Sequence, residues 1–382
     1  MSDIYSYIRE YGKKTFEQEP FNEVDALIFS QLAYVNFSGL VCKFDSDVKI
    51  SLKEAAYEFF ELYDEDYLKS LISISYKASE ILKLCAASKR FSNVRLLKYD
   101  DNVNEKIDKQ FSGVNFYISP SLAVIAFRGT DTTLTGIKES AMLSYMFPVP
   151  AQIEALHYFQ ESALIANRDV IICGHSKGGN LAVFAGLNCS NSTKRRIKGI
   201  YEFDAPGFPK EVLSRYDYVQ IKDKVYSYIP QRSIIGRMLY HDTSLKIVNS
   251  ENENLKQHQV SSWQIKENHF IFVDETDSVS KFIDKYLKQL SNDIGEENIE
   301  EVFETVFTLL EDAGVKEFDD FKKFDIQKLF KAIRALKSID EQQAKIIEET
   351  FKSAVKEFSQ LMYHDRITDK FQIKSSNDNK EE

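Results

Sequence analysis

The sequence predicts an α/β fold with a mostly parallel sheet, a helical N-terminal region and a C-terminal helical extension. Three observations lead to this prediction. Short apolar runs alternate with helical segments in residues 113–278, residues 1–112 contain helical periodicity broken by short polar stretches, and residues 279–366 keep helical periodicity with few strand signals. Strands that alternate with helices are typical of βαβ units, whose parallel sheet is covered by helices on both faces.

The composition agrees with a folded protein and argues against one class of function. The 382 residues allow two or three domains, and 43% of them are hydrophobic. A net charge of −10 argues against nucleic-acid binding, which needs a clustered basic face. The four cysteines are widely spaced and form no Cys-x-x-Cys pair, so neither a zinc site nor a disulfide framework is indicated.

Targeting features are also few. Residues 1–21 carry charges every few positions, without the apolar region or the cleavage site of a signal peptide. No uninterrupted apolar run approaches the roughly 18 residues that span a bilayer. We therefore expect a cytoplasmic protein without a transmembrane segment, although a dedicated secretion route would leave no such mark.

The N-terminal elements, in chain order, are helices. Residues 22–35 place apolar side chains at helical spacing, and Ser51 is a capping signal for a helix that follows it. Residues 113–130 then predict two strands around a turn at Ser119–Pro120.

Three further short strands are predicted at residues 169–174, 197–206 and 223–230. A helix over 149–167 is predicted before the first of these strands, and a helix over 177–190 between the first and the second. This is the alternation on which the parallel sheet is predicted.

The C-terminal helices carry surplus charge and an apolar stripe that includes Phe303, Val306, Phe307 and Leu310. We expect this stripe to pack within its own bundle or against the preceding domain, and a surface for a protein partner is the second interpretation. The polar tail, residues 367–382, is expected to be disordered.

Ser176 lies in the pattern Gly174-His175-Ser176-Lys177-Gly178, which follows a predicted strand and opens a predicted helix. A G-x-S-x-G pattern in this setting is typical of a nucleophile elbow, a sharp turn that needs small residues two positions before and after the serine. Ser176 is therefore predicted to be a catalytic nucleophile, and the structural alternative is a glycine-rich turn with an incidental serine. Adjacent side chains diverge on such a turn, so His175 is expected to be packed structure rather than the base.

A nucleophilic serine needs an oxyanion hole. In this architecture one donor is the amide after the nucleophile, here Lys177, and the other comes from the loop after an earlier strand. That loop follows Phe127, and Thr130 could offer both its amide and its hydroxyl. Arg128 and Asp131 are expected to form a structural ion pair or to fix the loop.

The stretch "AFRGTD", followed about fifty residues later by "GHSKGGNLAVFA", resembles the class 3 lipase group of α/β-hydrolases. A wider set of blocks, including "YEFDAPGF", "IPQRSIIGRML" and "QHQVSSWQI", is similar to the Mbeg1-like family within that group. The resemblance covers about residues 5 to 275 and implies an α/β-hydrolase fold, but no particular substrate. Lys177 stands where lipases of this group usually have an apolar residue, and residues 137–140 depart from the expected Trp-Lys-Glu-Asp.

In the α/β-hydrolase order the acid and the histidine follow the serine. His258, in "QHQVSSWQI", matches the block in which class 3 lipases carry the catalytic histidine, so the resemblance assigns it as the base. His269 and His241 stay open as alternatives, and His364 lies in the helical tail.

The acid is less well defined. Class 3 lipases carry it after the strand that here ends at Pro230, where Gln231, Arg232 and Ser233 supply no carboxylate. Asp204 ends the preceding strand and is our candidate, because carboxyl ends of parallel strands face the edge where such sites assemble. Its structural alternative is fixing the turn through backbone amides. Asp242 is the reserve candidate, and a Ser–His dyad without an acid stays open.

The sequence therefore predicts a serine hydrolase that acts on acyl esters or lipids, without a cofactor or metal. Ser176 would attack, His258 would transfer the proton, Asp204 would orient the imidazole, and the amides of Thr130 and Lys177 would bind the oxyanion. Residues 142–150 could line an apolar cleft or belong to the core. The alternative function is a catalytically incomplete hydrolase fold that binds a partner through its C-terminal helices.

Overall fold

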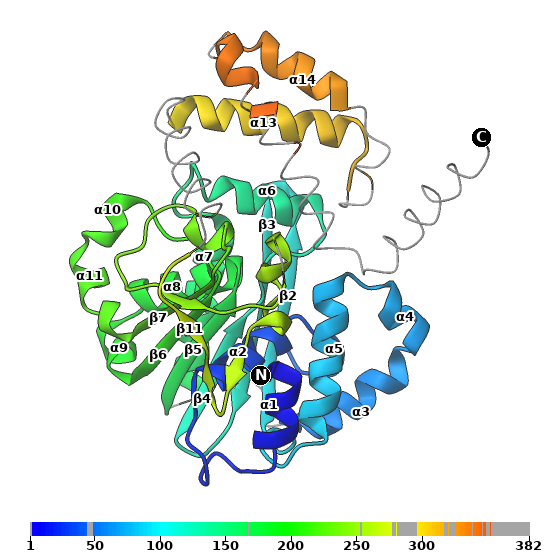
Figure 1. Ribbon diagram of the computed structural model, residues 1–382, viewed down its shortest axis with the longest axis vertical. Coiled ribbons are helices and arrows are strands. Elements are labelled where there is room, and N and C mark those ends of the chain that lie inside the picture. The colour runs from blue at the N-terminus through cyan, green and yellow to red at the C-terminus, as the bar shows by residue number, and fades with distance from the viewer. Residues whose placement is uncertain are drawn as a thin grey trace, which may run out of the picture.

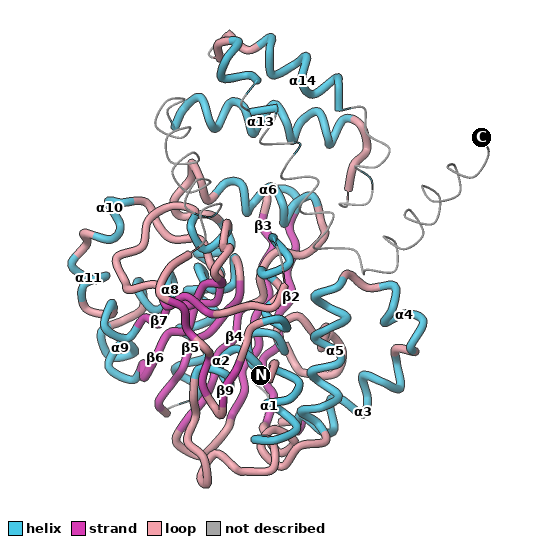
Figure 2. Tube along the Cα trace, in the orientation of Figure 1, coloured by secondary structure: helices cyan, strands magenta, loops and turns pink. Residues whose placement is uncertain are grey.

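The computed structural model of the protein describes residues 2–43, 49–166, 168–252, 254–276, 280, 296–316, 320, 326–337, 339–345, 347–348 and 352. A sheet crosses the middle of this structure and is flanked by helices (Figure 2). The tail over 367–382, which is expected to be disordered, lies outside the described residues, and so do parts of the region 279–366 that is expected to be helical.

The large sheet has nine described strands in the order β1-β2-β3-β4-β5-β6-β7-β8-β11. Its parallel part consists of β4 (Leu122–Phe127), β5 (Asp169–His175), β6 (Ile197–Phe203), β7 (Val225–Pro230) and β8 (Lys246–Val248). The outer strands, β1 (Ile50–Ser51), β2 (Arg95–Asn104), β3 (Lys109–Tyr117) and β11 (Phe272–Val273), pair antiparallel. A separate hairpin joins β9 (Ile265–Lys266) to β10 (His269–Phe270). The predicted α/β class is confirmed.

Helices cover both faces of the sheet (Figure 1). On one face, the N-terminal helices α1 (Ile4–Tyr11), α2 (Glu23–Leu32), α3 (Leu52–Leu62) and α5 (Ser73–Ala86) share a core with Val124, Ile171 and Phe203; α4 (Glu65–Ser70) packs beside α5. On the other face, α7 (Pro150–Ala166) and α8 (Lys177–Asn188) bury Ile125, Ile172 and Ile200. Of the short helices, α11 (Tyr216–Val219) packs against α8, α10 (Lys210–Leu213) packs against α11, and α9 (Asn191–Arg196) packs against α7.

Most expected elements occur where the patterns place them. The helix predicted after Ser51 begins there with a full capping box, in which Ser51 accepts from the amide of Glu54 and the Glu54 side chain accepts from the Ser51 amide. The two strands around Ser119–Pro120 are β3 and β4.

The region expected to be helical as far as residue 112 ends in strands instead. β1, β2 and the first residues of β3 fall within it, and β2 and β3 form a long antiparallel pair. Two features of β2 hide its period. Its register shifts between Leu97 and Asp100, and its second half is polar. A bulge and a polar edge remove the alternation by which a strand is recognised.

The C-terminal helices α13 (Glu296–Asp312) and α14 (Ile326–Ala335) lie beyond α6 (Leu134–Met142), as Figure 1 shows. Val306, Phe307 and Leu310 are buried in one cluster with Phe330 of α14 and with Leu134 of α6. The apolar stripe thus packs both within its own bundle and against the preceding domain. Met142, Leu143 and Val149 form a small buried cluster, so these members of the 142–150 segment belong to the core.

Candidate active site

Ser176 sits on a strained turn between β5 and α8. Its backbone angles are φ 56° and ψ −134°, a conformation that non-glycine residues seldom adopt. The glycines on either side permit the turn, because a Cβ on Gly174 would lie 2.1 Å from the carbonyl oxygen of Gly178, and one on Gly178 would lie 2.2 Å from that of Phe127. The Ser176 side chain does not cap α8. Strain of this kind collects at functional sites, and here it presents a hydroxyl at the carboxyl edge of the sheet.

His258 and Asp204 are joined directly. The Nδ1 atom of His258 lies 2.6 Å from Oδ2 of Asp204, across 54 residues of sequence. Asp204 follows β6 with φ 45° and is 1% exposed. Its other oxygen accepts hydrogen bonds from the hydroxyl of Ser233 at 2.5 Å and the amide of Gly236 at 3.1 Å. A carboxylate with all these partners is held in one orientation, and it favours the Nδ1–H form of the imidazole.

The side chain of His175 contacts both the ring and the backbone carbonyl of His258. The two rings lie 4.4 Å apart between centroids, and Nε2 of His175 is 2.9 Å from the carbonyl oxygen of His258. Since a carbonyl only accepts, His175 donates from Nε2, and its Nδ1 accepts from the hydroxyl of Tyr34 at 3.0 Å. Burial lowers the pKa of His175 well below its usual value, so the ring is neutral. His175 is packed structure, as its place on the turn predicts.

The position of His258 relative to Ser176 follows from these contacts. The His258 ring packs, tilted by 39°, against the ring of His175, the residue before Ser176, and Asp204 follows the strand whose Phe203 carbonyl accepts from the Ser176 amide. Among the described residues, no direct hydrogen bond joins Ser176 Oγ to the His258 ring.

The other histidines have different partners. His241 Nδ1 lies 3.6 Å from the carboxylate of Glu202, and its ring is nearly buried. The side chain of His269 is 60% exposed and hydrogen-bonds to Glu23 at 2.9 Å. Neither is paired with Asp204, and His364 lies outside the described residues.

The reserve acid, Asp242, lies on the surface. Its side chain is 45% exposed, and its carboxylate lies 3.7 Å from Lys222 Nζ. The structure thus brings together the two residues that were our first candidates for base and acid, and it gives Asp242 a lysine partner instead.

Thr130 lies on the loop that runs past the elbow. Its neighbour Gly129 approaches the turn so closely that a Cβ would lie 3.1 Å from the Cβ of Ser176. The Thr130 hydroxyl is 2.6 Å from that of Ser140, which donates to the Gly136 carbonyl at 2.9 Å. Lys177 is the first residue of α8, so its amide is one of the helix N–H groups without an intrahelical partner.

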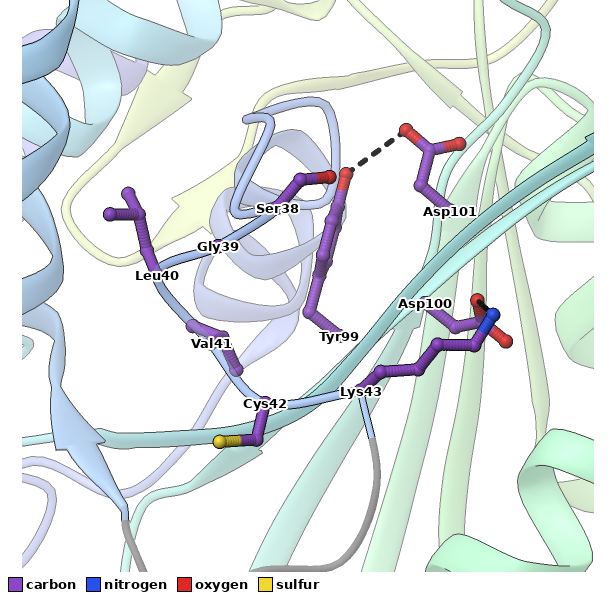
Figure 3. A pocket seen from close by; sticks show the side chains of 9 residues that line it. All are labelled: Ser38, Gly39, Leu40, Val41, Cys42, Lys43, Tyr99, Asp100 and Asp101. Carbon is purple, nitrogen blue, oxygen red and sulfur yellow. Dashed lines mark hydrogen bonds and ion pairs between the residues drawn. The ribbon is translucent and has the colours of Figure 1, made fainter.

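The loop is fixed by an ion pair that the sequence predicts only in part. Arg128 lies 3.4 Å from Asp131, as expected, but its two terminal nitrogens also form a bidentate pair with Asp101 at 2.8 and 2.9 Å. Asp101 lines a cavity of about 380 Å³ between β2 and the segment after α2. The Tyr99 hydroxyl donates to Asp101, its neighbour on β2, at 3.2 Å, and Lys43 lies 2.9 Å from Asp100. Figure 3 shows these side chains lining the cavity. The loop that carries Thr130 and this cavity therefore share one carboxylate.

Sequence reasoning missed several residues that hold the site in place. Ser233 and Gly236, which bind Asp204, lie in the "IPQRSIIGRML" block, and that block is the signal that could have found them. Tyr34 lies 141 residues from its partner His175 and carries no local pattern.

A strained serine between a central parallel strand and a helix, within a sheet covered on both faces, defines the α/β-hydrolase fold. The chain belongs to the Mbeg1-like family, whose model matches residues 85–308. The family resemblance predicted from the sequence is confirmed.

Solved structures similar to this chain include lipases. The M37 lipase is 15% identical over 57% of this chain and 69% of its own, with a TM-score of 0.35. The Rhizomucor miehei lipase propeptide complex is 10% identical over 68% and 76%, with a TM-score of 0.35. The Lip2 lipase from Yarrowia lipolytica is 12% identical over 64% and 84%, with a TM-score of 0.36. A comparison with curated proteins gave no match.

None of the helices in the described part of the chain combines the length and the hydropathy needed to cross a membrane.

Proposed function

We propose that the protein is a serine hydrolase that cleaves carboxylic esters, lipid esters among them, through an acyl-enzyme. The observation that carries this proposal is the 2.6 Å contact between His258 and a fully held, buried Asp204, beside a strained serine elbow. This contact supports the proposal, because a loop histidine and an aspartate that only fixes its turn need not be hydrogen-bonded to each other.

In the proposed first step, His258 takes the proton of the Ser176 hydroxyl while Ser176 Oγ attacks the ester carbonyl. Asp204 holds the Nδ1–H form, which leaves Nε2 as the acceptor, and it stabilises the imidazolium that forms. The negative charge that develops on the carbonyl oxygen is bound by the amides of Thr130 and Lys177. His258 then gives its proton to the leaving alkoxide, and the alcohol departs.

In the second step, a water molecule gives a proton to His258 and attacks the acyl-enzyme. Collapse of the tetrahedral intermediate returns the proton to Ser176 and releases the carboxylic acid. His175 contributes by holding the backbone of His258 through its carbonyl, and Tyr34 keeps His175 in the tautomer that can do so.

The test is covalent labelling with a fluorophosphonate, together with hydrolysis of p-nitrophenyl esters of increasing acyl length. We expect labelling of the wild type, none in Ser176→Ala or His258→Ala, and turnover lower by several orders of magnitude in both. His241→Ala and His269→Ala are the matched controls and should keep activity. A wild type that is neither labelled nor active would favour a binding protein, and activity lost only at His241 or His269 would move the base.

A further inference from the structure

Lys177 directly follows Ser176, and its side chain forms a buried ion pair with Glu139 of α6. The Lys177 Nζ to Glu139 Oε2 distance is 2.8 Å, and the two side chains are 1% and 0% exposed. Our mechanism uses only the amide of Lys177, so the charged end of this side chain has no part in it.

Every hydrogen-bonding group of the pair has a partner. The Lys177 ammonium donates to Glu139, to the Gln110 carbonyl at 2.8 Å and to the Gln110 side-chain oxygen at 2.7 Å. The Glu139 carboxylate also accepts from the Gln110 amide at 2.9 Å and the Ala151 amide at 2.6 Å. The pair therefore ties together α8, α6, β3 and the beginning of α7.

Stability alone does not account for such a pair. Removing two charges from water costs several kcal/mol per ion, and well-packed apolar residues of similar volume often serve as well or better. An ion pair differs from an apolar contact in being directional, because three donors and two carboxylate oxygens fix the positions of the elements that carry them.

The elements fixed in this way carry the two proposed oxyanion donors. Lys177 supplies one amide itself. Thr130 lies on the loop that leads into α6, and its hydroxyl contacts Ser140, the residue after Glu139. The Lys177–Glu139 contact thus sets the spacing between α8 and the helix that anchors the Thr130 loop.

We propose that Lys177 and Glu139 are positioning residues, which hold the amides of Lys177 and Thr130 at the separation that a tetrahedral oxyanion requires. This proposal rests on the proposed function. It assigns a role to the position at which the sequence departs from the lipase pattern, a lysine in place of an apolar residue.

The test compares Lys177→Met and Glu139→Gln with the wild type in the full-length protein. Each variant keeps the backbone amides and the approximate side-chain volume. The matched control is Arg90→Met, which breaks a second fully buried ion pair, with Asp25, in the N-terminal region. For each protein we would measure kcat and KM on one ester, the same constants on its thionoester, and the melting temperature.

A thionoester develops its negative charge on sulfur, a weaker hydrogen-bond acceptor, so the ratio of oxoester to thionoester turnover reports how well the oxyanion hole fits. Loss of a complete oxyanion donor costs about 10²- to 10³-fold in kcat, and misplacement should cost about 10- to 100-fold. We expect this loss in Lys177→Met and Glu139→Gln, a similar KM and a smaller ratio. Arg90→Met should lower the melting temperature and leave the ratio unchanged.

The outcomes separate the two proposals. An active wild type with unchanged kcat and ratio in both variants would overturn the positioning role and leave the hydrolase proposal standing. A wild type that is neither labelled by fluorophosphonate nor active would overturn the hydrolase proposal, and the positioning role with it. If Lys177→Met does not fold, Glu139→Gln decides, because its single amide oxygen can still accept from Lys177 and the Gln110 amide, while its NH₂ group then faces the Ala151 amide and only that backbone contact is lost.

Discussion

The substitution Asp204→Asn tests the least certain member of the proposed site, because the structure dictates how the new amide must be oriented. One side of the Asp204 carboxylate faces the Gly236 amide, which can only donate, at 3.1 Å. The asparagine oxygen has to occupy that side, since its NH₂ group there would meet another donor. The NH₂ group is then directed at Nδ1 of His258, where the carboxylate oxygen now lies at 2.6 Å.

This orientation forces His258 into the wrong tautomer. With an amide donor facing it, Nδ1 becomes the acceptor and the ring proton moves to Nε2, which can no longer take the proton of Ser176. The corresponding change in a serine protease lowers turnover by about 10⁴-fold, equivalent to about 5 kcal/mol of barrier height. Because the Gly236 hydrogen bond survives, stability should fall by only about 1 kcal/mol.

The assay measures kcat and melting temperature of Asp204→Asn beside Asp242→Asn, the control, whose side chain is 45% exposed. Near-normal turnover in Asp204→Asn would refute the catalytic role, and Asp204 would then be a residue that fixes its turn. Collapse of turnover only in Asp242→Asn would transfer the role to Asp242. Near-normal turnover in both variants would leave a dyad of Ser176 and His258.

Two further predictions concern the residues around the elbow. Burial holds the pKa of His175 well below its usual value, so the unfolded chain takes up a proton that the native state does not as the pH falls below about 6.5. His175 should therefore lower the free energy of unfolding by about 1.4 kcal/mol for each unit by which the pH falls below about 6.5. Urea titrations at several pH values should show that His175→Gln lacks this contribution. Equal pH slopes of the unfolding free energy in wild type and variant would contradict the prediction. Gly178→Ala would place a Cβ 2.2 Å from the Phe127 carbonyl oxygen, so thermal melts should show a loss of about 3 kcal/mol or more, and a wild-type melting temperature would contradict the turn geometry.

The parallel half of the fold could be predicted because its strands are buried on both sides. β5 and β7 are short, almost wholly buried runs between helices and turns, and their composition alone separates them from the helices. β2 is different, because a bulge interrupts it and polar residues fill its second half. The pairing of β2 with β3 depends on both strands, so the sequence of β2 alone does not predict it.

Those residues of the candidate site that lie at the ends of strands could be predicted from the sequence. Ser176 follows a strand and is framed by glycines, and Asp204 ends the next strand, so a rule about strand ends finds both. His258 lies in a short 3₁₀ helix with no such mark, and only the family block singled it out. Their roles remain predictions, while the hydrogen bond between His258 and Asp204 is a property of the structure.

The supporting contacts could not be predicted, because each joins residues that are distant in sequence. The Lys177 side chain meets Gln110 across 67 residues and Glu139 across 38. Nothing local distinguishes a lysine that will be buried from one that will be exposed, and composition favours the exposed state. What the sequence did indicate was the departure itself, a lysine where an apolar residue was expected.

Helix α6 shows why the C-terminal helices and the site cannot be treated as separate units. Its Lys138 lies 3.8 Å from Glu304 and 3.7 Å from Glu311 of α13, and the next residue, Glu139, is turned inward to Lys177. The amide of Leu134, at the start of α6, donates to the carbonyl of Lys316 at 2.7 Å, and its side chain is buried among those of α13 and α14. Neighbouring residues of one nine-residue helix thus bind the C-terminal region and the elbow. Helix α6 is therefore the structural connection between the C-terminal helices and the loop that carries Thr130.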